Sequence, residues 1–310
     1  MRVVLFGGGG FIGRHLAAAL SARGHHVIIA TRHREAVKND LILLPNTDVI
    51  ACDYNQAQTV HPMLEGADAA VNLIGILNER DKGEFERVHC ELTRILVAGA
   101  LAHKVRRFIH ISALGASAFA PSAYLRSKAK AEQALKDIIG MRTVIMRPSV
   151  VFGSGNSFVT FFAKLTRRLP FLFLPCADSL MQPITVEDMV RLLVGALENG
   201  DSDGKTLSLG GPDILPLSDI VSKVTYACGH PRRIIELGGR VSYMAATLAD
   251  YQPFDLPFSR DNCLSASVAN VCSADGNDAA RLLNDLSSLE SGLAKLFVRR
   301  DSWGDLRARR

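Results

Sequence analysis

A glycine-rich turn near the start of the chain most constrains what it can fold into. The apolar run Arg2-Val-Val-Leu-Phe6 leads into Gly7-Gly-Gly-Gly10, and Gly13 follows within a helical pattern that ends near Arg23. A strand, a glycine turn and a helix in this order present backbone N–H groups and a helix N-terminus to a pyrophosphate. The spacing Gly7-x-x-Gly10-x-x-Gly13 therefore predicts a dinucleotide site; a flexible turn without a ligand is the alternative.

Each glycine of this turn has a predicted task. Gly7 turns the chain sharply off the strand, and Gly10 lets the backbone approach the phosphates where a Cβ atom would collide. Gly13 lets the following helix pack closely against the sheet. We predict that the turn and the start of the helix bind the cofactor through Gly7, Gly9, Gly10, Phe11, Ile12 and Gly13. Arg14, just past Gly13, is expected to point to the pocket for a 2′-phosphate.

The first half of the chain alternates between strand-like and helix-like patterns. Strands separated by long helices indicate a parallel sheet with helices on both faces, and right-handed crossovers then give a doubly wound α/β sheet, the Rossmann fold. The expected strands are 3–6, 27–30, 49–52, 69–74, 108–112 and 143–147, and the expected helices are 11–23, 56–65, 84–103 and 123–139. The ligand crevice of such a sheet lies beyond the carboxyl ends of its strands.

The pattern loosens after Pro148, which predicts a second region. We expect residues 1–153 to form the dinucleotide-binding domain, with residues 183–210 returning to it. Residues 154–182 and 211–310 are expected to form a smaller, mostly helical substrate or cap region.

The end of the second expected strand indicates which nucleotide binds. NAD-binding folds carry an Asp or Glu there for the ribose hydroxyls, but this chain has Arg32 and Arg34 instead. A carboxylate would repel a 2′-phosphate, whereas a guanidinium group pairs with it. The sequence therefore favours NADP(H) over NAD; alternatively, the two arginines are solvated loop residues.

Other cofactor contacts follow from the topology. Asp53, after the third strand, is placed to accept a hydrogen bond from the adenine amino group, or it is a turn or N-cap residue. Asn72 and Gly75 end the fourth strand, where Gly75 lets the backbone pass close to the adenosine ribose. Arg147 and Pro148 end the sixth strand at the nicotinamide end of the crevice, and Pro148 also terminates that strand.

Tyr124 and Lys128 are the candidates for proton transfer. Residues four apart share one face of a helix, and an ammonium group beside a phenol lowers the phenol's pKa. Tyr124 could then exchange a proton with a carbonyl or alcohol oxygen while hydride moves at the nicotinamide. Lys128 would also hold the nicotinamide ribose, and Ser112 would hydrogen-bond the substrate oxygen. The alternative is a surface helix with a half-buried Tyr124 and a solvated Lys128.

Composition argues against several classes of protein. The 310 residues are 48% hydrophobic, and the net charge of +5 is too small to indicate nucleic-acid binding. No apolar run is long enough to span a bilayer, and no His, Cys and Asp spacing indicates a metal site. Six cysteines without a C-x-x-C pair are interpreted as reduced core thiols. We expect a cytoplasmic monomer or homodimer.

One segment is compatible with a peripheral contact to a membrane. Arg167-Arg-Leu-Pro-Phe-Leu-Phe-Leu-Pro175 is basic and then strongly apolar. This pattern is typical of a lid or a pocket wall, and also of contact with a membrane surface.

Several motifs together resemble the extended and atypical short-chain dehydrogenase/reductases. They are the glycine turn, Asp53, residues 72–75, Phe108-Ile-His-Ile-Ser-Ala-Leu-Gly115, Tyr124–Lys128, Arg147–Gly153 and Gln182–Asp188. Ser112–Ala116, Tyr124–Lys128 and Phe258–Asn262 look most similar to the branch with the NADPH-binding accessory subunit of mitochondrial complex I and its bacterial relatives. The resemblance covers about residues 1–275.

The resemblance implies different functions. The wider family implies NAD(P)-dependent redox or epimerase chemistry, whereas the branch implies a tightly held, structural NADPH. Ala113 follows Ser112 where sugar epimerases often carry a second hydroxyl, and the gap from Ser112 to Tyr124 is shorter than theirs. We expect an NADP(H)-dependent oxidoreductase for a small hydrophobic carbonyl or alcohol. The second alternative is a nucleotide-binding scaffold or assembly protein of a respiratory or quinone-related membrane complex, and the last is a nucleotide-sugar epimerase or dehydratase.

Overall fold

The chain divides into two units in a computed structural model that describes residues 1–41, 43–155, 158–249 and 259–297. The first unit comprises Met1–Pro148 and Met189–Ser208, and the second comprises Ser149–Asp188 and Leu209–Arg310. Part of the predicted cap region, residues 250–258 and 298–310, lies outside the described residues, and so does Phe258 of the motif above.

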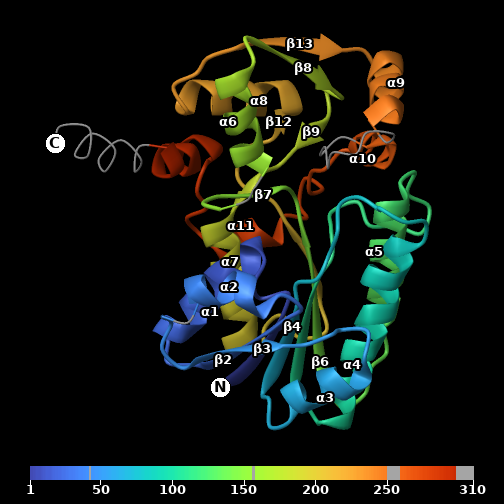
Figure 1. Cartoon of the computed structure of the whole chain (residues 1–310), viewed down its shortest axis with the longest axis vertical. Coiled ribbons are helices and arrows are strands. Elements are labelled where there is room, and N and C mark those ends of the chain that lie inside the picture. Colours follow the sequence, from blue (N-terminus) through green and yellow to red (C-terminus); the bar gives the residue numbers. More distant parts are fainter. Residues whose placement is uncertain (42, 156–157, 250–258, 298–310) are drawn as a thin grey trace, which may run out of the picture. The chain divides into compact units, whose positions relative to one another are not determined.

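A seven-stranded sheet of order β11-β6-β5-β4-β1-β2-β3 forms the centre of the first unit (Figure 1). Its strands are β1 (Arg2–Phe6), β2 (His26–Thr31), β3 (Thr47–Ala51), β4 (Ala69–Asn72), β5 (Arg107–Ile111), β6 (Arg142–Pro148) and β11 (Thr206–Leu209). Neighbouring strands from β6 to β3 run parallel. The predicted doubly wound α/β fold is confirmed, and the chain reverses its direction of winding between β1 and β4.

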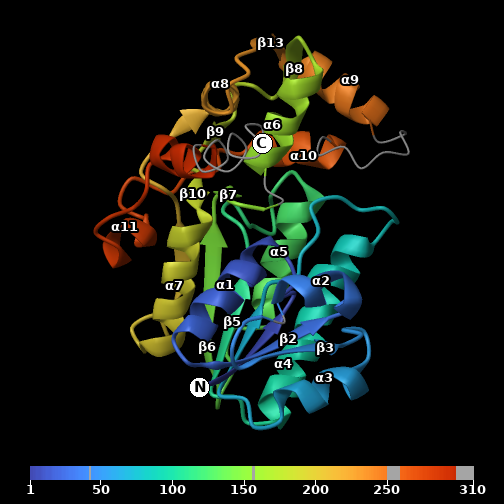
Figure 2. The same cartoon turned by 60° about the vertical axis from the view of Figure 1, so that its left-hand side comes forward.

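Helices cover both faces of this sheet. They are α1 (Phe11–Ala22), α2 (Arg34–Leu41), α3 (Ala57–Leu64), a π-helical turn η1 (Glu86–Glu91) that runs into α4 (Leu92–Ala102), α5 (Ala123–Gln133) and α7 (Val186–Glu198). Figure 2 shows α1 and α7 on one side of the sheet and α3, α4 and α5 on the other. Apolar side chains of α3 and α4 pack on the strands, and this cluster includes Phe6, Leu64, Leu96 and Phe108.

Three helices differ from the prediction. The helix expected over 84–103 begins with the π-helical turn, and the helix expected over 123–139 ends at Gln133. Helix α2 was not predicted, because it is short and mostly polar and buries only Val37 and Leu41 among its described side chains.

The second unit combines helices with three small two-stranded sheets. Its strands are β7 (Val151–Phe152), β8 (Phe171–Pro175), β9 (Leu180–Met181), β10 (Ile184–Thr185), β12 (Leu215–Pro216) and β13 (Arg233–Leu237). Its helices are α6 (Phe158–Arg168), α8 (Leu217–Ala227), α9 (Gly239–Ala249), α10 (Arg260–Ala266) and α11 (Asp278–Leu282), and residues 289–297 are also helical. A separate apolar cluster, which includes Phe162, Leu174 and Val221, forms its core.

Candidate nucleotide-binding and active site

The predicted site residues gather at one edge of the sheet. The glycine turn follows β1, Arg32 follows β2, and Gly75 follows β4. Ser112 follows β5, and Pro148 ends β6. Because all these strands run parallel, their carboxyl ends meet at the edge where a doubly wound sheet binds its ligand, beside the β1–β4 reversal.

The glycine turn has the predicted sharp bend. Gly7 has a φ of +80°, a conformation that favours glycine. A Cβ atom on Gly13 would lie 2.5 Å from the Cα of Gly8. Gly13 therefore allows the helix to approach the turn itself, a tighter contact than the helix-to-sheet packing that we expected.

The start of α1 is open to an anion. Gly10 is the N-cap and supplies no side-chain cap, and the first turn holds no acidic residue. The N–H groups of Phe11, Ile12 and Gly13 have no acceptor within the helix, as in any first helical turn. The guanidinium Nε of Arg14 donates to the carbonyl of Gly9 at 2.8 Å, which holds a positive charge beside the turn. This cradle fits a pyrophosphate.

Tyr54 was missed from the sequence, although it supports the glycine turn. Its hydroxyl donates to the carbonyl of Ala30 at 2.8 Å and accepts from the N–H of Gly7 at 3.3 Å. The side chain is buried, and burial raises the pKa of Tyr54 to about 12. One hydroxyl thus joins the ends of β1 and β2. No local pattern marks it, since both partners are distant in sequence.

The two arginines after β2 lie in different surroundings. The guanidinium carbon of Arg32 lies 5.9 Å from the ring centroid of Tyr54, and the residue is exposed. Arg34 begins α2, donates from Nε to the carbonyl of Val49 at 3.0 Å, and pairs with Glu35. Arg32 is therefore the better placed of the two for a ligand, whereas Arg34 has a structural role in the turn.

Asp53 adopts its alternative role as a turn residue. Its Oδ1 accepts from the N–H of Asn55 at 3.1 Å and its Oδ2 accepts from Gln56 at 2.8 Å. The N–H of Asn55 is the main cause that lowers the pKa of Asp53. The carboxylate therefore orders the chain after β3, and its predicted contact with adenine stays a prediction.

Asn72 is buried in a polar network at the end of β4. Its Nδ2 donates to Thr93 at 3.0 Å and to Nδ1 of His110 at 3.2 Å, while its Oδ1 accepts from the N–H of Ile74 at 3.1 Å. The side chain thus shapes the backbone that leads to Gly75. Its predicted contact with the cofactor stays a prediction.

Lys128 lies beside Gly75, as a shared cofactor site requires. Its Nζ donates to the carbonyl of Ile111 at 3.1 Å and lies 3.2 Å from where a Cβ on Gly75 would be. The side chain is buried, and burial lowers the pKa of Lys128 to about 8. The alternative of a solvated surface lysine is therefore wrong.

Tyr124 lies in the first turn of α5. The helix begins at Ala123 because Ser122 caps it: the Ser122 hydroxyl accepts a hydrogen bond from the N–H of Leu125 at 3.2 Å. Its ring contacts Phe85 and His89, with centroid distances of 5.9 and 5.6 Å. Burial of its hydroxyl raises the pKa of Tyr124 to about 12. The prediction that Lys128 lowers this pKa is therefore wrong for the protein alone, because desolvation dominates.

His89 fixes the backbone around this pair. Its Nε2 accepts from the N–H of Ile76 at 3.1 Å, so the proton of the neutral ring lies on Nδ1, which donates to Ser127 at 2.8 Å. Ser127 in turn donates to the carbonyl of Tyr124 at 2.7 Å. His89 and His110 are buried, as predicted. The prediction that both are satisfied holds for His89 and is wrong for His110, because its Nε2 is buried without a hydrogen-bond partner among the described residues.

Ser112 and Arg147 both donate hydrogen bonds to the carboxylate of Glu132, which the sequence analysis did not identify. Ser112 donates to Oε1 of Glu132 at 2.5 Å, and Arg147 donates to both oxygens of that carboxylate. Pro148 supplies only backbone here, since its carbonyl accepts from the N–H of Leu114 at 3.1 Å. The side chains predicted for substrate and nicotinamide contacts therefore hold the structure together, and those contacts stay predictions.

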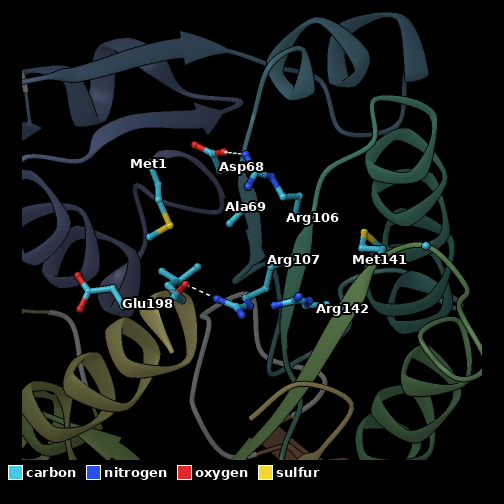
Figure 3. A pocket seen from close by; sticks show the side chains of 10 residues that line it. Met1, Asp68, Ala69, Arg106, Arg107, Met141, Arg142 and Glu198 are labelled. Atoms are coloured by element: carbon cyan, nitrogen blue, oxygen red, sulfur yellow. Dashed lines mark hydrogen bonds and ion pairs between the residues drawn. The ribbon is translucent and has the colours of Figure 1, made fainter. Parts of the chain in front are cut away.

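A cavity of about 640 Å³ lies at the opposite edge of the sheet (Figure 3). It is lined at the amino ends of β4, β5 and β6, and Arg106, Arg107 and Arg142 reach into it. Asp68 pairs with Arg106, and Asp203 pairs with the other two arginines. Each of the three arginines thus has an acidic partner, and two of them share one carboxylate.

These features define a protein of the dinucleotide-binding Rossmann class. Residues 3–210 match the model of the NAD dependent epimerase/dehydratase family. The chain belongs to that family, which confirms the resemblance to extended short-chain dehydrogenase/reductases and the prediction of an NAD(P) site.

Individual relatives show the range of this family. The chain is 28% identical over 260 residues to NADH dehydrogenase [ubiquinone] 1 alpha subcomplex subunit 9, mitochondrial, of Arabidopsis thaliana. The aligned region covers 82% of this chain and 64% of the plant protein. The chain thus spans less than two thirds of the plant subunit. A ceramide reductase of Caulobacter vibrioides is 27% identical, over 80% of this chain and 77% of the reductase.

The same fold occurs in solved structures of low sequence identity. An epimerase of Methanothermobacter thermautotrophicus superposes with a TM-score of 0.78 over 99% of this chain and 94% of that protein, at 17% identity. This likeness shows the fold alone.

Proposed function

We propose that the protein is an NADP(H)-dependent reductase or dehydrogenase for an apolar carbonyl or alcohol. The observation that carries this proposal is the place of Lys128, buried beside Gly75 and one helical turn from Tyr124. The Lys128 amine thus lies at the ends of β4 and β5, which supports a role in holding the nicotinamide ribose. The ceramide reductase relative supports an apolar substrate, since ceramide is a lipid.

NADP(H) supplies or accepts hydride when bound, and the residues of the chain bind it, orient it and transfer the proton. The first turn of α1 and Arg14 hold the pyrophosphate, and Arg32 pairs with the 2′-phosphate. Lys128 orients the nicotinamide ribose. Tyr124, protonated at neutral pH because its pKa is about 12, gives its proton to the carbonyl oxygen as that oxygen gains charge.

The test is NADPH oxidation by the full chain with long-chain ketones and aldehydes. Tyr124→Phe should lower turnover about 100-fold or more, because the proton donor is lost, while NADPH affinity stays within about twofold by fluorescence titration. Tyr226→Phe, at a tyrosine that is 71% exposed, is the matched control. Turnover that survives in Tyr124→Phe would reject this role.

A second candidate is a nucleotide-binding scaffold at a membrane. One face of the second unit favours it: Phe171 and Phe173 of β8 are 43% and 57% exposed, and their ring centroids lie 5.4 Å apart. Arg233 of β13 pairs in register with Phe171 and so shares that face. Arg167 and Arg168 are exposed just before β8. Aromatic groups flanked by arginines suit an anionic lipid surface.

The complex I subunits among the relatives support this candidate, although the chain matches only part of their length. Among the described helices, none has the length and apolar character to span a bilayer, so any attachment through this face would be peripheral. The scaffold candidate further expects NADPH that survives purification but is oxidised by no carbonyl or quinone.

Vesicle sedimentation separates the two candidates. Binding to vesicles with phosphatidylglycerol should weaken about tenfold or more in the double variant Phe171→Ser, Phe173→Ser, and should weaken with salt. Phe119→Ser, at a phenylalanine that is 97% exposed in the first unit, is the control. Equal binding of all three proteins would reject the membrane face, and capture of a protein instead of lipid would replace the proposed partner.

A further inference from the structure

Two cysteines of the second unit lie at one cavity. Cys176 directly follows β8, and Cys263 lies in α10. Both line a cavity of about 540 Å³, and both are in the reduced thiol form. Neither residue belongs to the nucleotide site, so their arrangement is not explained by the proposed function.

Ser242 of α9 holds the two cysteines in place. Its Oγ accepts from the N–H of Cys176 at 3.1 Å and donates to the carbonyl of Leu237 at 2.8 Å. The Sγ of Cys263 contacts the carbonyl of Ser242 at 3.9 Å. The two thiols share a hydrogen bond. Three elements therefore converge to bring two sulfur atoms together.

The two thiols are not equivalent. Cys176 is half-buried at the cavity, whereas Cys263 is buried. The hydrogen bond from Cys263 lowers the pKa of Cys176, while burial and the Asp178 carboxylate oppose this effect. Because the thiolate is the reactive form, Cys176 is the nucleophile of the pair and Cys263 is its neighbour.

We propose that Cys176 and Cys263 form a peroxide-sensitive pair that closes to a disulfide. The Cys176 thiolate attacks one oxygen of hydrogen peroxide, so an S–O bond forms, the O–O bond breaks, and hydroxide leaves to become water. This step oxidises Cys176 to sulfenic acid. Cys263, which loses its proton to water, then attacks the Cys176 sulfur; an S–S bond forms and the S–O bond breaks with release of a second water. Two thiols and one peroxide give one disulfide and two waters.

The disulfide joins the turn after β8 to α10 across the serine that both cysteines contact. It closes a long loop of the chain, which includes Met189–Ser208 of the first unit, and long loops gain the most from a crosslink in the chain-entropy model. The oxidised protein should therefore unfold at a higher temperature than the reduced protein, and a thiol reductant should reverse the change.

The test oxidises the reduced full chain with increasing hydrogen peroxide, blocks the remaining thiols, and maps the peptides by mass spectrometry. We expect a Cys176–Cys263 peptide link as the first product in the unmutated protein. In Cys263→Ser, or in Cys263→Ala if serine impairs folding, a Cys176 sulfenic acid should accumulate and react with dimedone. Cys176→Ser should give neither product.

Cys228→Ser is the matched control, because Cys228 is half-buried in the same unit and contacts Thr166 instead of a second thiol. It should form the Cys176–Cys263 link at the rate of the unmutated protein. Oxidation of Cys228 or Cys272 before Cys176 would overturn the proposal. A Cys176 sulfenic acid that persists in the unmutated protein would overturn it as well.

Discussion

The hydroxyl of Ser112 donates a hydrogen bond of 2.5 Å to Oε1 of Glu132, the carboxylate that also pairs with Arg147. This carboxylate lies at the end of α5 and joins the strand ends of β5 and β6. It therefore fixes the helix that carries Tyr124 and Lys128. A buried charge with three donors of this kind is stable only while its partners remain.

Glu132→Gln should destabilise the protein by about 2–4 kcal/mol, because it leaves the half-buried guanidinium of Arg147 without its counter-charge. Urea unfolding at neutral pH measures the change. Glu86→Gln is the control: Glu86 pairs with Lys130 at the surface, where the side chains are 38% and 49% exposed. Glu86→Gln should lower the free energy of unfolding by less than about 1 kcal/mol. Equal decreases in the two variants would contradict the proposed role of Glu132.

Gly13→Ala should unfold the start of α1 or displace it, because the new Cβ would lie 2.5 Å from backbone that cannot move aside cheaply. We expect a loss of about 1–3 kcal/mol together with weaker binding of both NADPH and NADH. Thermal unfolding and fluorescence titration measure the two effects.

Gly195→Ala provides the comparison for the glycine experiment. Gly195 lies within α7, and a Cβ atom there would meet nothing within 4 Å. Alanine should therefore stabilise the helix by about 0.5–1 kcal/mol. If Gly13→Ala behaved like Gly195→Ala, the close approach of α1 to the glycine turn would be unimportant.

The sequence allowed the parallel sheet, its helices other than α2, and the edge that carries the site to be predicted. Apolar periodicity and the glycine spacing are local signals, and the alternation of strands and helices then determines which strand ends meet. Gly75 and Lys128 were each predicted at this edge of the sheet from the topology, whereas their contact with one another was not predicted.

The hydrogen-bond partners of individual polar side chains could not be predicted. Ser112 and Arg147 point at Glu132, and Tyr54 bonds to Gly7 and Ala30, so each bond joins residues far apart in sequence. A strand-end serine or arginine has the same local sequence whether it faces a ligand or a buried carboxylate. The prediction of a lowered pKa for Tyr124 was wrong for a related reason, since this pKa depends on burial of the side chain by distant residues.

Arg32 should determine the preference for NADPH. Arg32→Ser should weaken NADPH binding about 10-fold or more, which corresponds to loss of a charged hydrogen bond, and should leave NADH within about twofold because NADH lacks the 2′-phosphate. Titration of nucleotide fluorescence measures both affinities.

Arg34→Ser is the matched variant for this experiment. Arg34 is already bound to Val49 and Glu35, so its replacement should change the affinities for NADPH and NADH by the same small factor. If Arg34→Ser lost NADPH selectively while Arg32→Ser did not, the assignment of the two arginines would be reversed.

His89 and His110 should make the fold sensitive to acid. Burial lowers the pKa of His89 to about 2 and that of His110 to about 3, from an ordinary value of 6.5. The unfolded chain takes up a proton at each ring as the pH falls below about 6.5, whereas the folded chain stays neutral. Their contribution to stability is therefore complete above that pH and is lost progressively towards the folded pKa, by about 1.4 kcal/mol per pH unit for each ring.

Urea unfolding between about pH 7.5 and pH 4.5 should show a shallower slope of unfolding free energy against pH in His89→Gln than in the unmutated protein. His33→Gln, at an exposed histidine, should retain the original slope; identical slopes in all three proteins would mean that His89 is protonated in the folded state.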